Sequence, residues 1–365
     1  MKTVIIAVWW AAWQATAVPA LLAQVPGPEV TTSHAAPRLL LMGDGATSGP
    51  MASATRTGAA VVDASATAAA GSPPPAPAGF TWQAIPELSD EFDGGALDEQ
   101  KWLPKHAYWN GREPSAHDPA NVSVKDGMLR LRNTTRVTTL EGIKNPEKDV
   151  WLQAACISSR GPKASYGYYA ARLKASKLCM TSSFWFQGKY SEIDVVEQLG
   201  VSRKNPAKDR LMLMNTHFFT DGWRKDKATP KSWQMPTGSA DTFHVYGVWW
   251  KDPSTVWMYH DGQKVAELTT GGPFKEPQYL FFDTEVFTWE GLPTIESLND
   301  PARNTMLVDW VRAWKLVKNA NAAVENTLAD PRCRFLSSFN WEGIHHNQAA
   351  LAAIRQVVAA SATKH

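Results

Sequence analysis

Residues 121–132 read Asn121-Val-Ser-Val-Lys-Asp-Gly-Met-Leu-Arg-Leu-Arg132. Two short runs with β-forming residues flank the Asp-Gly pair, which is a strong signal for the two-residue turn of a β-hairpin. A second stretch of the same kind is Val256-Trp-Met-Tyr-His-Asp-Gly-Gln-Lys-Val265. Two such hairpins in one region predict antiparallel sheets.

The pattern of these hairpins extends over residues 80–318. Short runs rich in Val, Ile, Tyr, Phe and Trp are separated by Gly, Asn, Asp and Pro, and long helical periodicity is missing. Strands spaced in this way are typical of two packed sheets. We therefore predict an all-β domain, a jelly-roll sandwich of two antiparallel sheets with an open substrate groove.

The segments on either side of this domain have different compositions. Residues 1–23 combine a basic start with an apolar run from Val4 to about Trp13 and then small residues, as in a signal peptide. The run is too short to span a bilayer, so we expect a secreted protein without a membrane partner. Residues 24–79 resemble an Ala/Ser/Pro-rich linker, and residues 319–365 form a tail with a helix expected near Asn347–Val358.

The overall composition favours a globular protein and excludes one class of function. Among 365 residues, 44% are hydrophobic and 20% are charged, and 37 basic against 35 acidic residues give a net charge of only +2. A nucleic-acid binder is not expected from this balance. The 17 Trp residues fit either a Trp-rich β core or a sugar-binding groove.

Three cysteines, Cys156, Cys179 and Cys333, allow at most one disulfide and show no metal-ligand spacing. No oxygen-ligand motif identifies a calcium site either, although folds of this kind can carry a structural calcium. We expect no metal and no cofactor.

Three acidic residues lie close together in Ser191-Glu-Ile-Asp-Val-Val-Glu-Gln198. In a regular strand Glu192 and Asp194 share one face and Glu197 points to the other. A β-bulge at Val195-Val196 returns Glu197 to the first face, and bulges are common beside active sites. The alternative is a strand whose acids face solvent, but its apolar residues favour an interior strand, where crowded acids require a function.

Glycoside hydrolysis requires two carboxyl groups, one ionised and one protonated. With the bulge, the carboxyl groups of Glu192 and Glu197 should lie about 5–5.5 Å apart, as in retaining enzymes. Glu192 is then the nucleophile and Glu197 the acid/base. Asp194 hydrogen-bonds the nucleophile and helps to keep Glu197 protonated.

The motif Glu192-Ile-Asp-Val-Val-Glu197 resembles the Glu-x-Asp-x-x-Glu signature of family 16 glycoside hydrolases, which fold as a β-jelly roll. The resemblance covers most of residues 80–317, and its further motifs are Ser89-Asp-Glu-Phe-Asp93, Tyr166-Gly-Tyr-Tyr-Ala-Ala-Arg172 and Val308-Asp-Trp-Val-Arg-Ala-Trp314. Within the family, the chain is most similar to the β-agarases and β-porphyranases of red-algal galactans. The motifs for this are Trp109-Asn-Gly-Arg112, Met214-Asn-Thr-His-Phe-Phe219 and Asp283-Thr-Glu-Val-Phe-Thr-Trp-Glu290.

The resemblance implies a set of substrate-binding residues around the acids. They are Trp109, Arg112, Trp185, His217, Trp289 and Glu290. His217 is placed close to the acids and Trp185 beneath a sugar, although both also fit ordinary core packing. Arg112 is either a solvated loop cation or a ligand for a sulfate ester or hydroxyl groups.

The resemblance implies a monomeric, β-agarase-like endo-hydrolase that binds a red-algal galactan. Two features leave the polymer open. The segment 283–289 departs from the agarase pattern, and the basic segment 220–230 favours a sulfated galactan. The alternatives are a β-porphyranase, carrageenase or β-1,3-glucanase of the same fold, a transglycosylase, and a lectin-like binding protein without catalysis.

Overall fold

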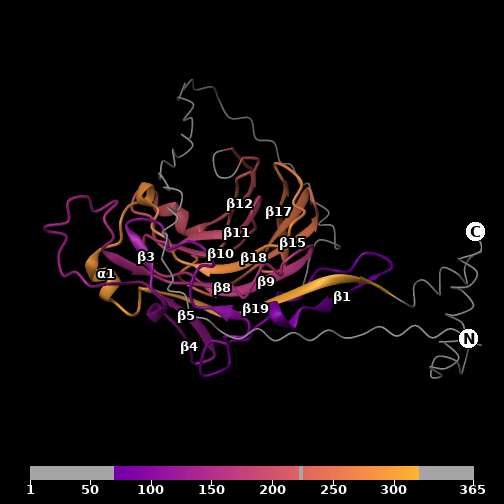
Figure 1. The fold of residues 1–365 in the computed structure, drawn as a ribbon, viewed down its shortest axis with the longest axis horizontal. Helices are drawn as coiled ribbons and strands as arrows, with labels where there is room; N and C mark the ends of the chain where they lie inside the picture. Colours follow the sequence, from indigo (N-terminus) through magenta and orange to yellow (C-terminus); the bar gives the residue numbers. More distant parts are fainter. Residues whose placement is uncertain (1–69, 222–224, 320–365) are drawn as a thin grey trace, which may run out of the picture. The chain divides into compact units, whose positions relative to one another are not determined.

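The computed structural model describes residues 70–221 and 225–319. The predicted signal peptide, most of the predicted linker and the predicted C-terminal helix lie outside these residues. The described part consists of two large antiparallel sheets and one small sheet (Figure 1). The predicted all-β class and the two antiparallel sheets are confirmed.

The first sheet has eight strands among the described residues, in the order β17-β16-β15-β9-β19-β5-β4, with β1 also paired to β19. Its strands are β1 (Phe80–Ala84), β4 (Val122–Lys125), β5 (Met128–Arg132), β9 (Gly167–Lys174), β15 (His244–Asp252), β16 (Thr255–His260), β17 (Gln263–Thr269) and β19 (Thr305–Lys318).

The second sheet carries the acidic motif and has the order β13-β12-β11-β10-β18-β8-β2, with β14 also paired to β12. Its strands are β2 (Trp102–Leu103), β8 (Cys156–Ser159), β10 (Thr181–Gln187), β11 (Ser191–Leu199), β12 (Leu211–Phe219), β13 (Asp226–Ala228), β14 (Lys231–Gln234) and β18 (Tyr279–Asp283). The motif therefore lies on β11, which is inside the sheet and not at its edge.

A third sheet of three short strands was not predicted. It contains β3 (Ser115–His117), β6 (Thr134–Thr135) and β7 (Leu152–Ala154), and β3 pairs with β7 in parallel. Helical elements among the described residues are short: the 3-10 turns η2 (Pro86–Leu88), η3 (Pro119–Asn121), η4 (Pro206–Arg210) and η5 (Thr288–Glu290), and the α-helix α1 (Ile295–Asn299). None of the helices in this part of the chain has the length and apolarity to cross a membrane.

Both predicted hairpins are present. The turn between β4 and β5 has positive φ at Asp126 (55°) and Gly127 (69°), and the turn between β16 and β17 has positive φ at Asp261 (47°) and Gly262 (83°). Positive φ at both central residues defines the turn whose twist matches that of the flanking strands.

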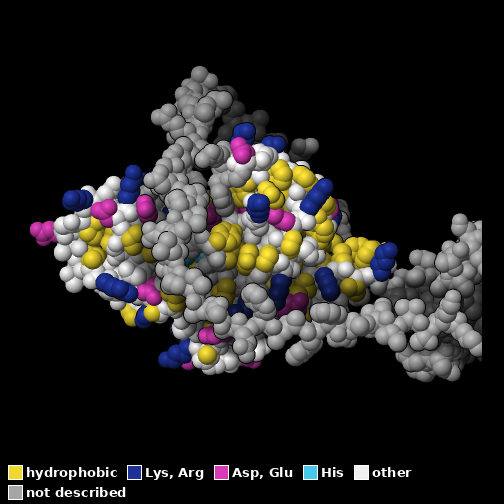
Figure 2. Space-filling view, in the orientation of Figure 1, with side chains coloured by type: hydrophobic (Ala, Val, Ile, Leu, Met, Phe, Trp, Pro, Cys, Tyr) yellow, Lys and Arg dark blue, Asp and Glu magenta, His cyan; other side chains and the backbone are white. Residues whose placement is uncertain are grey.

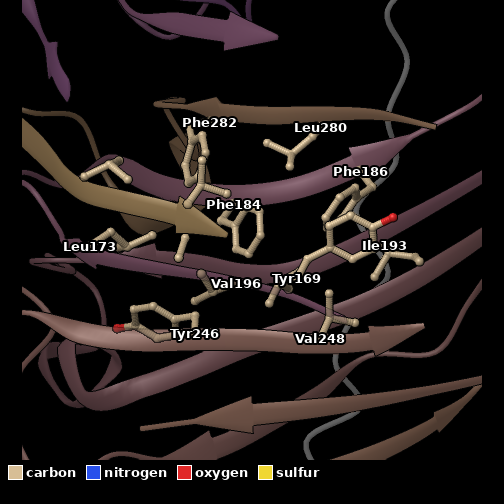
Figure 3. Packing of buried hydrophobic residues seen from close by; sticks show 14 of the residues in the cluster. Tyr169, Leu173, Phe184, Phe186, Ile193, Val196, Tyr246, Val248, Leu280 and Phe282 are labelled. Carbon is tan, nitrogen blue, oxygen red and sulfur yellow. The ribbon is translucent and has the colours of Figure 1, made fainter. Parts of the chain in front are cut away.

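The core lies between the two large sheets. Tyr169 and Tyr246 from the first sheet meet Phe184, Ile193 and Phe282 from the second in one buried apolar cluster (Figure 3). Burial of side chains from both inner faces fixes the two sheets against each other. The other face of the second sheet is then free to carry polar and catalytic groups.

Charged side chains are dispersed over the face of the domain seen in Figure 2. Lys and Arg side chains alternate with Asp and Glu and with apolar patches, and they do not form one basic field. Recognition of an anionic substrate on this face would therefore depend on individual cations rather than on a general field.

Candidate active site

The acidic strand contains the predicted bulge. In the pairing of β10 with β11, Phe184 lies opposite Val196 and Trp185 lies opposite Asp194, so Val195 is an extra residue. Val195 and Val196 both belong to the buried core. Two consecutive side chains thus point into the core, and the acids on either side of them, Asp194 and Glu197, come to the opposite face.

The neighbouring strands add polar side chains to this face. On β12, His217 lies opposite Glu192 and Asn215 lies opposite Asp194. On β10, Gln187 lies opposite Glu192 and Trp185 lies opposite Asp194. Residues directly opposite each other in adjacent strands share a face, so all of these side chains surround the acids.

His217 is held by carboxylates on both sides of its ring. Its Nε2 atom lies 3.2 Å from Asp194 Oδ2 and 3.8 Å from Glu192 Oε1, and its Nδ1 atom lies 2.6 Å from Asp226 Oδ2. Burial alone would lower the pKa of His217, but the hydrogen bond and charge of Asp194, followed by Glu192 and Asp226, outweigh it and raise the pKa to about 10. The imidazolium therefore compensates part of the negative charge.

Asn215 opposes this protonation. Its amide nitrogen lies 2.8 Å from His217 Nε2, and its orientation is fixed because Oδ1 accepts hydrogen bonds from the backbone N–H groups of Thr216 and Thr229. A donor at that position favours an unprotonated Nε2. We take the imidazolium as the resting form, since charge-assisted bonds to carboxylates are about twice as strong as a neutral hydrogen bond.

Glu192 is the acid whose ionised form is stabilised by the most neighbouring groups. Burial and the neighbouring Asp194 charge raise its pKa well above the ordinary value, while His217 and a hydrogen bond from Gln187 act in the opposite direction. Gln187 in turn accepts a hydrogen bond from Tyr108. These two hydrogen bonds, from Tyr108 to Gln187 and from Gln187 to Glu192, fix the position of the Glu192 carboxylate.

Glu197 is the acid that best retains a proton. Burial, then Asp194 and then Glu285 raise its pKa to about 8, and no hydrogen bond from the described residues stabilises its charged form. The two glutamates cannot both ionise easily in one buried cluster. Because donors reach Glu192 and not Glu197, we place the shared proton on Glu197.

A second acidic group, not predicted from the sequence, lies next to Glu197. Glu285 accepts a hydrogen bond from Arg112 Nε at 2.5 Å, and Asp283, at the end of β18, is fully buried. Burial and the Glu285 charge raise the pKa of Asp283 well above its ordinary value, and Glu197 adds to the effect. The site therefore contains six carboxyl groups, including that of Asp226 beside His217, near one guanidinium and one imidazolium.

The predicted groove residues Trp109, Arg112 and Trp289 lie together. The Arg112 guanidinium carbon is 5.9 Å from the centre of the Trp109 ring and 5.7 Å from that of Trp289. Trp289 stacks on Phe287 at 4.4 Å and is 45% exposed. This aromatic cluster presents an open indole face, which suits the apolar face of a pyranose.

Trp185 lies on the same face as the acids but is only 6% exposed. Its ring stacks on Phe281 at 4.5 Å, and its indole N–H donates to Asp283 Oδ1 at 3.1 Å. Core packing, the alternative to a sugar platform, accounts for most of its surface. Trp185 thus forms the floor behind Asp194.

Glu290 does not join the other groove residues, which corrects the expectation drawn from the resemblance. Its side chain is 4% exposed and forms an ion pair with Lys208, and it accepts a hydrogen bond from Ser202 at 2.8 Å. The turn η5 points Trp289 outward and Glu290 inward. A buried carboxylate with these two partners serves the structure and is not free to bind sugar.

Tyr108 was missed at the sequence level. It is 55% exposed, and its ring makes edge contacts with Tyr279 and Phe281 on β18. Its position next to Trp109 in the sequence was the only signal for it. Tyr108 is therefore an exposed aromatic ring whose hydroxyl group is connected to Glu192 through Gln187.

Three groups of side chains in the described residues have ligand atoms close enough for a metal ion. The groups are Glu192, Asp194 and His217; His244, His260 and Asp261; and His117, Cys156 and Asp283. In the first group His217 bridges two of the acids, and in the second Asp261 accepts from His244 at 3.0 Å. In the third group both ring nitrogens of His117 and Asp283 Oδ2 have no hydrogen bond within the described residues, and the ion-pair distance between His117 and Asp283 is 4.0 Å.

Comparison with known proteins identifies the family of this domain. Residues 82–316 match the family model described as the GH16 domain of β-porphyranases A–D. The chain is 36% identical over 282 residues to β-porphyranase B of Phocaeicola plebeius, covering 67% of this chain and 88% of that protein. It is 29% identical over 273 residues to a β-agarase of the same organism, covering 66% and 86%.

A solved structure shows the same fold. The β-porphyranase BpGH16B from the human gut bacterium Bacteroides plebeius superposes with a TM-score of 0.59 at 33% sequence identity, covering 67% of this chain and 95% of that structure. Residues 82–316, which match the family model, include all three acids.

Proposed function

Because this chain belongs to the family of the β-porphyranase A–D GH16 domains, and is therefore a glycoside hydrolase, we propose that it is a secreted, monomeric, retaining endo-hydrolase that cleaves β-linkages in porphyran. The observation that carries the proposal is the bulge in β11, which brings Glu192, Asp194 and Glu197 to one face of the sheet.

The reaction follows from the protonation states of the two glutamates. A carboxylate oxygen of Glu192 attacks the anomeric carbon while the glycosidic C–O bond breaks, and Glu197 gives its proton to the leaving oxygen. Glu197, now ionised, removes a proton from water and is thereby protonated again. The water oxygen attacks the anomeric carbon as the bond between this carbon and Glu192 breaks, which releases Glu192 as a carboxylate.

Asp194 and His217 adjust the charge of this cycle. The Asp194 charge helps to hold the proton on Glu197, and His217 helps to hold Glu192 in its ionised form. As the glycosyl-enzyme forms, Glu192 loses its charge, and the pKa of Glu197 falls with the loss of that repulsion. Glu197 is then suited to act as a base in the second step.

The choice of porphyran over agarose rests on similarity and on one cation. Two β-porphyranases are 36% identical to the chain, whereas two β-agarases are 32% and 29% identical to it. The Nε atom of Arg112 donates a hydrogen bond to Glu285, and the Arg112 side chain is 30% exposed. Its terminal nitrogens can therefore donate hydrogen bonds to a sulfate ester. Agarose is the second candidate, because a β-agarase is also among the relatives.

A panel of polysaccharides tests the substrate. Porphyran, agarose, carrageenan and a β-1,3-glucan are incubated with the enzyme, and new reducing ends and the size distribution of the products are measured. We expect porphyran to give short oligosaccharides of mixed length at early times, with agarose cleaved at least about tenfold more slowly. Equal or faster cleavage of agarose would reverse the assignment, and release of single units only would contradict endo cleavage.

Substitution of the nucleophile tests the roles of the glutamates. Glu192→Gln keeps the size of the side chain but removes the attacking charge, and we expect turnover to fall by at least about 10⁴-fold while oligosaccharide binding persists. The matched control is Glu267→Gln, an exposed residue of β17. An active Glu192→Gln enzyme would refute the assignment.

The stereochemistry of the reaction and the export of the protein are tested separately. NMR of the first product should show the β-anomer before mutarotation, and an initial α-anomer would exclude the retaining mechanism. Export is checked by sequencing the N-terminus of protein recovered outside the producing cells. A mature protein that still begins at Met1 would contradict a cleaved signal peptide.

A further inference from the structure

A group of metal-ligand side chains lies behind the floor of the active site. His117 ends β3, Cys156 begins β8, and Asp283 ends β18 opposite Cys156. One ligand atom from each residue lies within 4.8 Å of the other two, and His117 Nε2 is 4.0 Å from Asp283 Oδ2. Three strands of two different sheets therefore converge on one point.

Three polar atoms of this group are buried without hydrogen-bond partners among the described residues. The side chain of His117 is 4% exposed and that of Asp283 is 0% exposed, yet neither ring nitrogen of His117 and not Asp283 Oδ2 has a hydrogen bond. Each buried unpaired polar group costs about 1–3 kcal/mol. The other Asp283 oxygen accepts from Trp185, which holds Oδ2 towards the group.

The surrounding charge favours a cation. Burial lowers the pKa of His117 to about 4, so its imidazole is neutral and has a free lone pair. Burial and the Asp283 and Glu285 charges raise the pKa of the Cys156 thiol. A divalent cation would stabilise both carboxylates and the thiolate, because metal binding displaces the protons of its ligands.

The ligand types select the class of metal. An imidazole nitrogen, a thiolate sulfur and a carboxylate oxygen form the mixed set that zinc and similar borderline divalent ions accept in tetrahedral sites. Calcium is disfavoured, since it requires six to eight oxygen ligands. The edge of a tetrahedral zinc site is about 3.3 Å between nitrogen and oxygen, so the ligand atoms of His117 and Asp283, which lie 4.0 Å apart, need to approach each other by less than about 1 Å.

We propose that His117, Cys156 and Asp283 bind one divalent transition-metal ion of the zinc class, with water in the fourth position. Cys156 and Asp283 release their protons to the solvent when the ion enters. The bound ion links β3 to β8 and β18, so it stabilises the folded protein. This site is independent of the polysaccharide assignment, because no sugar contact is involved in it.

Cobalt(II) provides the test, because a thiolate ligand gives Co²⁺ a charge-transfer absorption band in the near ultraviolet. The full chain is prepared as Cys179→Ser/Cys333→Ser, so that Cys156 is the single thiol, and is treated with EDTA before titration with CoCl₂. We expect the band and tetrahedral visible bands to saturate at one equivalent. Addition of ZnCl₂ should remove both and raise the melting temperature.

Substitutions assign the ligands. A further Cys156→Ser change should abolish the charge-transfer band, and His117→Gln should weaken Co²⁺ binding at least about tenfold. His260→Gln is the matched control, because the group of His244, His260 and Asp261 has no sulfur and cannot give the band. Circular dichroism confirms that each variant folds.

Two outcomes would overturn the proposal. One is the absence of the band at a tenfold excess of Co²⁺ in the protein with Cys156 as its single thiol. The other is a band that persists after Cys156→Ser. Neither outcome depends on galactan cleavage, and an enzyme inactive on every galactan would leave the metal result unchanged.

Discussion

The division of labour between Glu192 and Glu197 depends on single neighbouring residues. Both carboxyls are buried beside Asp194, which raises both pKa values. Gln187 donates a hydrogen bond to Glu192. After burial and Asp194, the largest effects on the pKa of Glu197 come from Glu285, which raises it, and Arg112, which lowers it. One strand can therefore hold an ionised and a protonated glutamate at the same pH.

The pH dependence of the reaction follows from Glu197. Its pKa is raised to about 8 by burial, Asp194 and Glu285, and it must be protonated to act as the acid. Activity should therefore be present below this pKa and be lost as the pH rises through it. Glu285→Gln removes one of the repelling charges, so we expect the basic limb of kcat/KM to move to lower pH by about one unit.

Measurements of kcat/KM between pH 6 and pH 10 check this shift. Glu267→Gln is the control, and the basic limb of its pH profile should lie at the same pH as in the wild type. An unchanged limb in Glu285→Gln would show that Glu285 does not act on the general acid. A limb displaced to higher pH would remove Glu197 from that role.

At this scale the spacing in the sequence predicted the acids, and the resemblance named His217 and Arg112 near them, but Glu285 was not predicted. Glu192, Asp194 and Glu197 are local, so their spacing and a bulge were sufficient to group them. Glu285 and Arg112 are 173 positions apart, and only the order of the strands brings them together. Glu290 was misplaced because adjacent residues of a turn point in opposite directions, which a motif does not encode.

The bulge of β11 is the element that makes the site. Deletion of Val195 would remove the extra residue and restore the regular alternation, with Val196 still towards the core and Asp194 and Glu197 still on the opposite face. We expect the protein to remain folded and hydrolysis to fall by about 10²-fold, because Glu197 is moved along the strand relative to Glu192.

Val195→Ala is the comparison, because it keeps the extra residue and removes only two buried methyl groups. It should retain most of its activity and lose about 2 kcal/mol of unfolding free energy. Activity assays and urea denaturation measure both effects. Full activity in the deletion variant would mean that the exact position of Glu197 along the strand is not important for catalysis.

The end of β11 depends on a close approach that only glycine allows. A Cβ atom added to Gly200 would overlap the carbonyl oxygen of Ser176, whereas one added to Gly95 would meet nothing within 4 Å. Overlap with backbone cannot be relieved by rotating a side chain. Gly200→Ala should therefore lose about 3 kcal/mol of stability, and Gly95→Ala should remain within about 0.5 kcal/mol of the wild type.

Chemical denaturation of the two variants side by side tests this contrast. Equal stabilities would indicate that Ser176 and its loop can move away. Such a result would also imply that the β11 terminus is less constrained than its burial suggests.

At the scale of the whole domain, the fold was easier to predict than the arrangement of the groove residues. The hairpins at Asp126-Gly127 and Asp261-Gly262 are short-range features, and the apolar runs report burial directly, so the all-β class follows from local patterns. The small sheet was missed because β3, β6 and β7 have only two or three residues each. Such short strands leave no periodicity in the sequence.

A fragment of residues 70–319 should carry the whole activity. Its two large sheets enclose a common core, and every side chain placed around the acids lies between Tyr108 and Trp289. A unit with its own core can fold by itself. We expect its melting temperature to lie within about 3 °C of the full chain and its kcat/KM to be equal within about twofold.

The decisive control is a fragment of residues 70–304, which lacks β19. That strand pairs with β1, β5 and β9, so its removal opens the first sheet at its centre and exposes the core. We expect this shorter fragment to be insoluble or unfolded by circular dichroism. If the fragment 70–319 also failed to fold or lost its activity, segments outside the two sheets would have to contribute to the catalytic unit, and the assignment of the groove to this domain alone would be wrong.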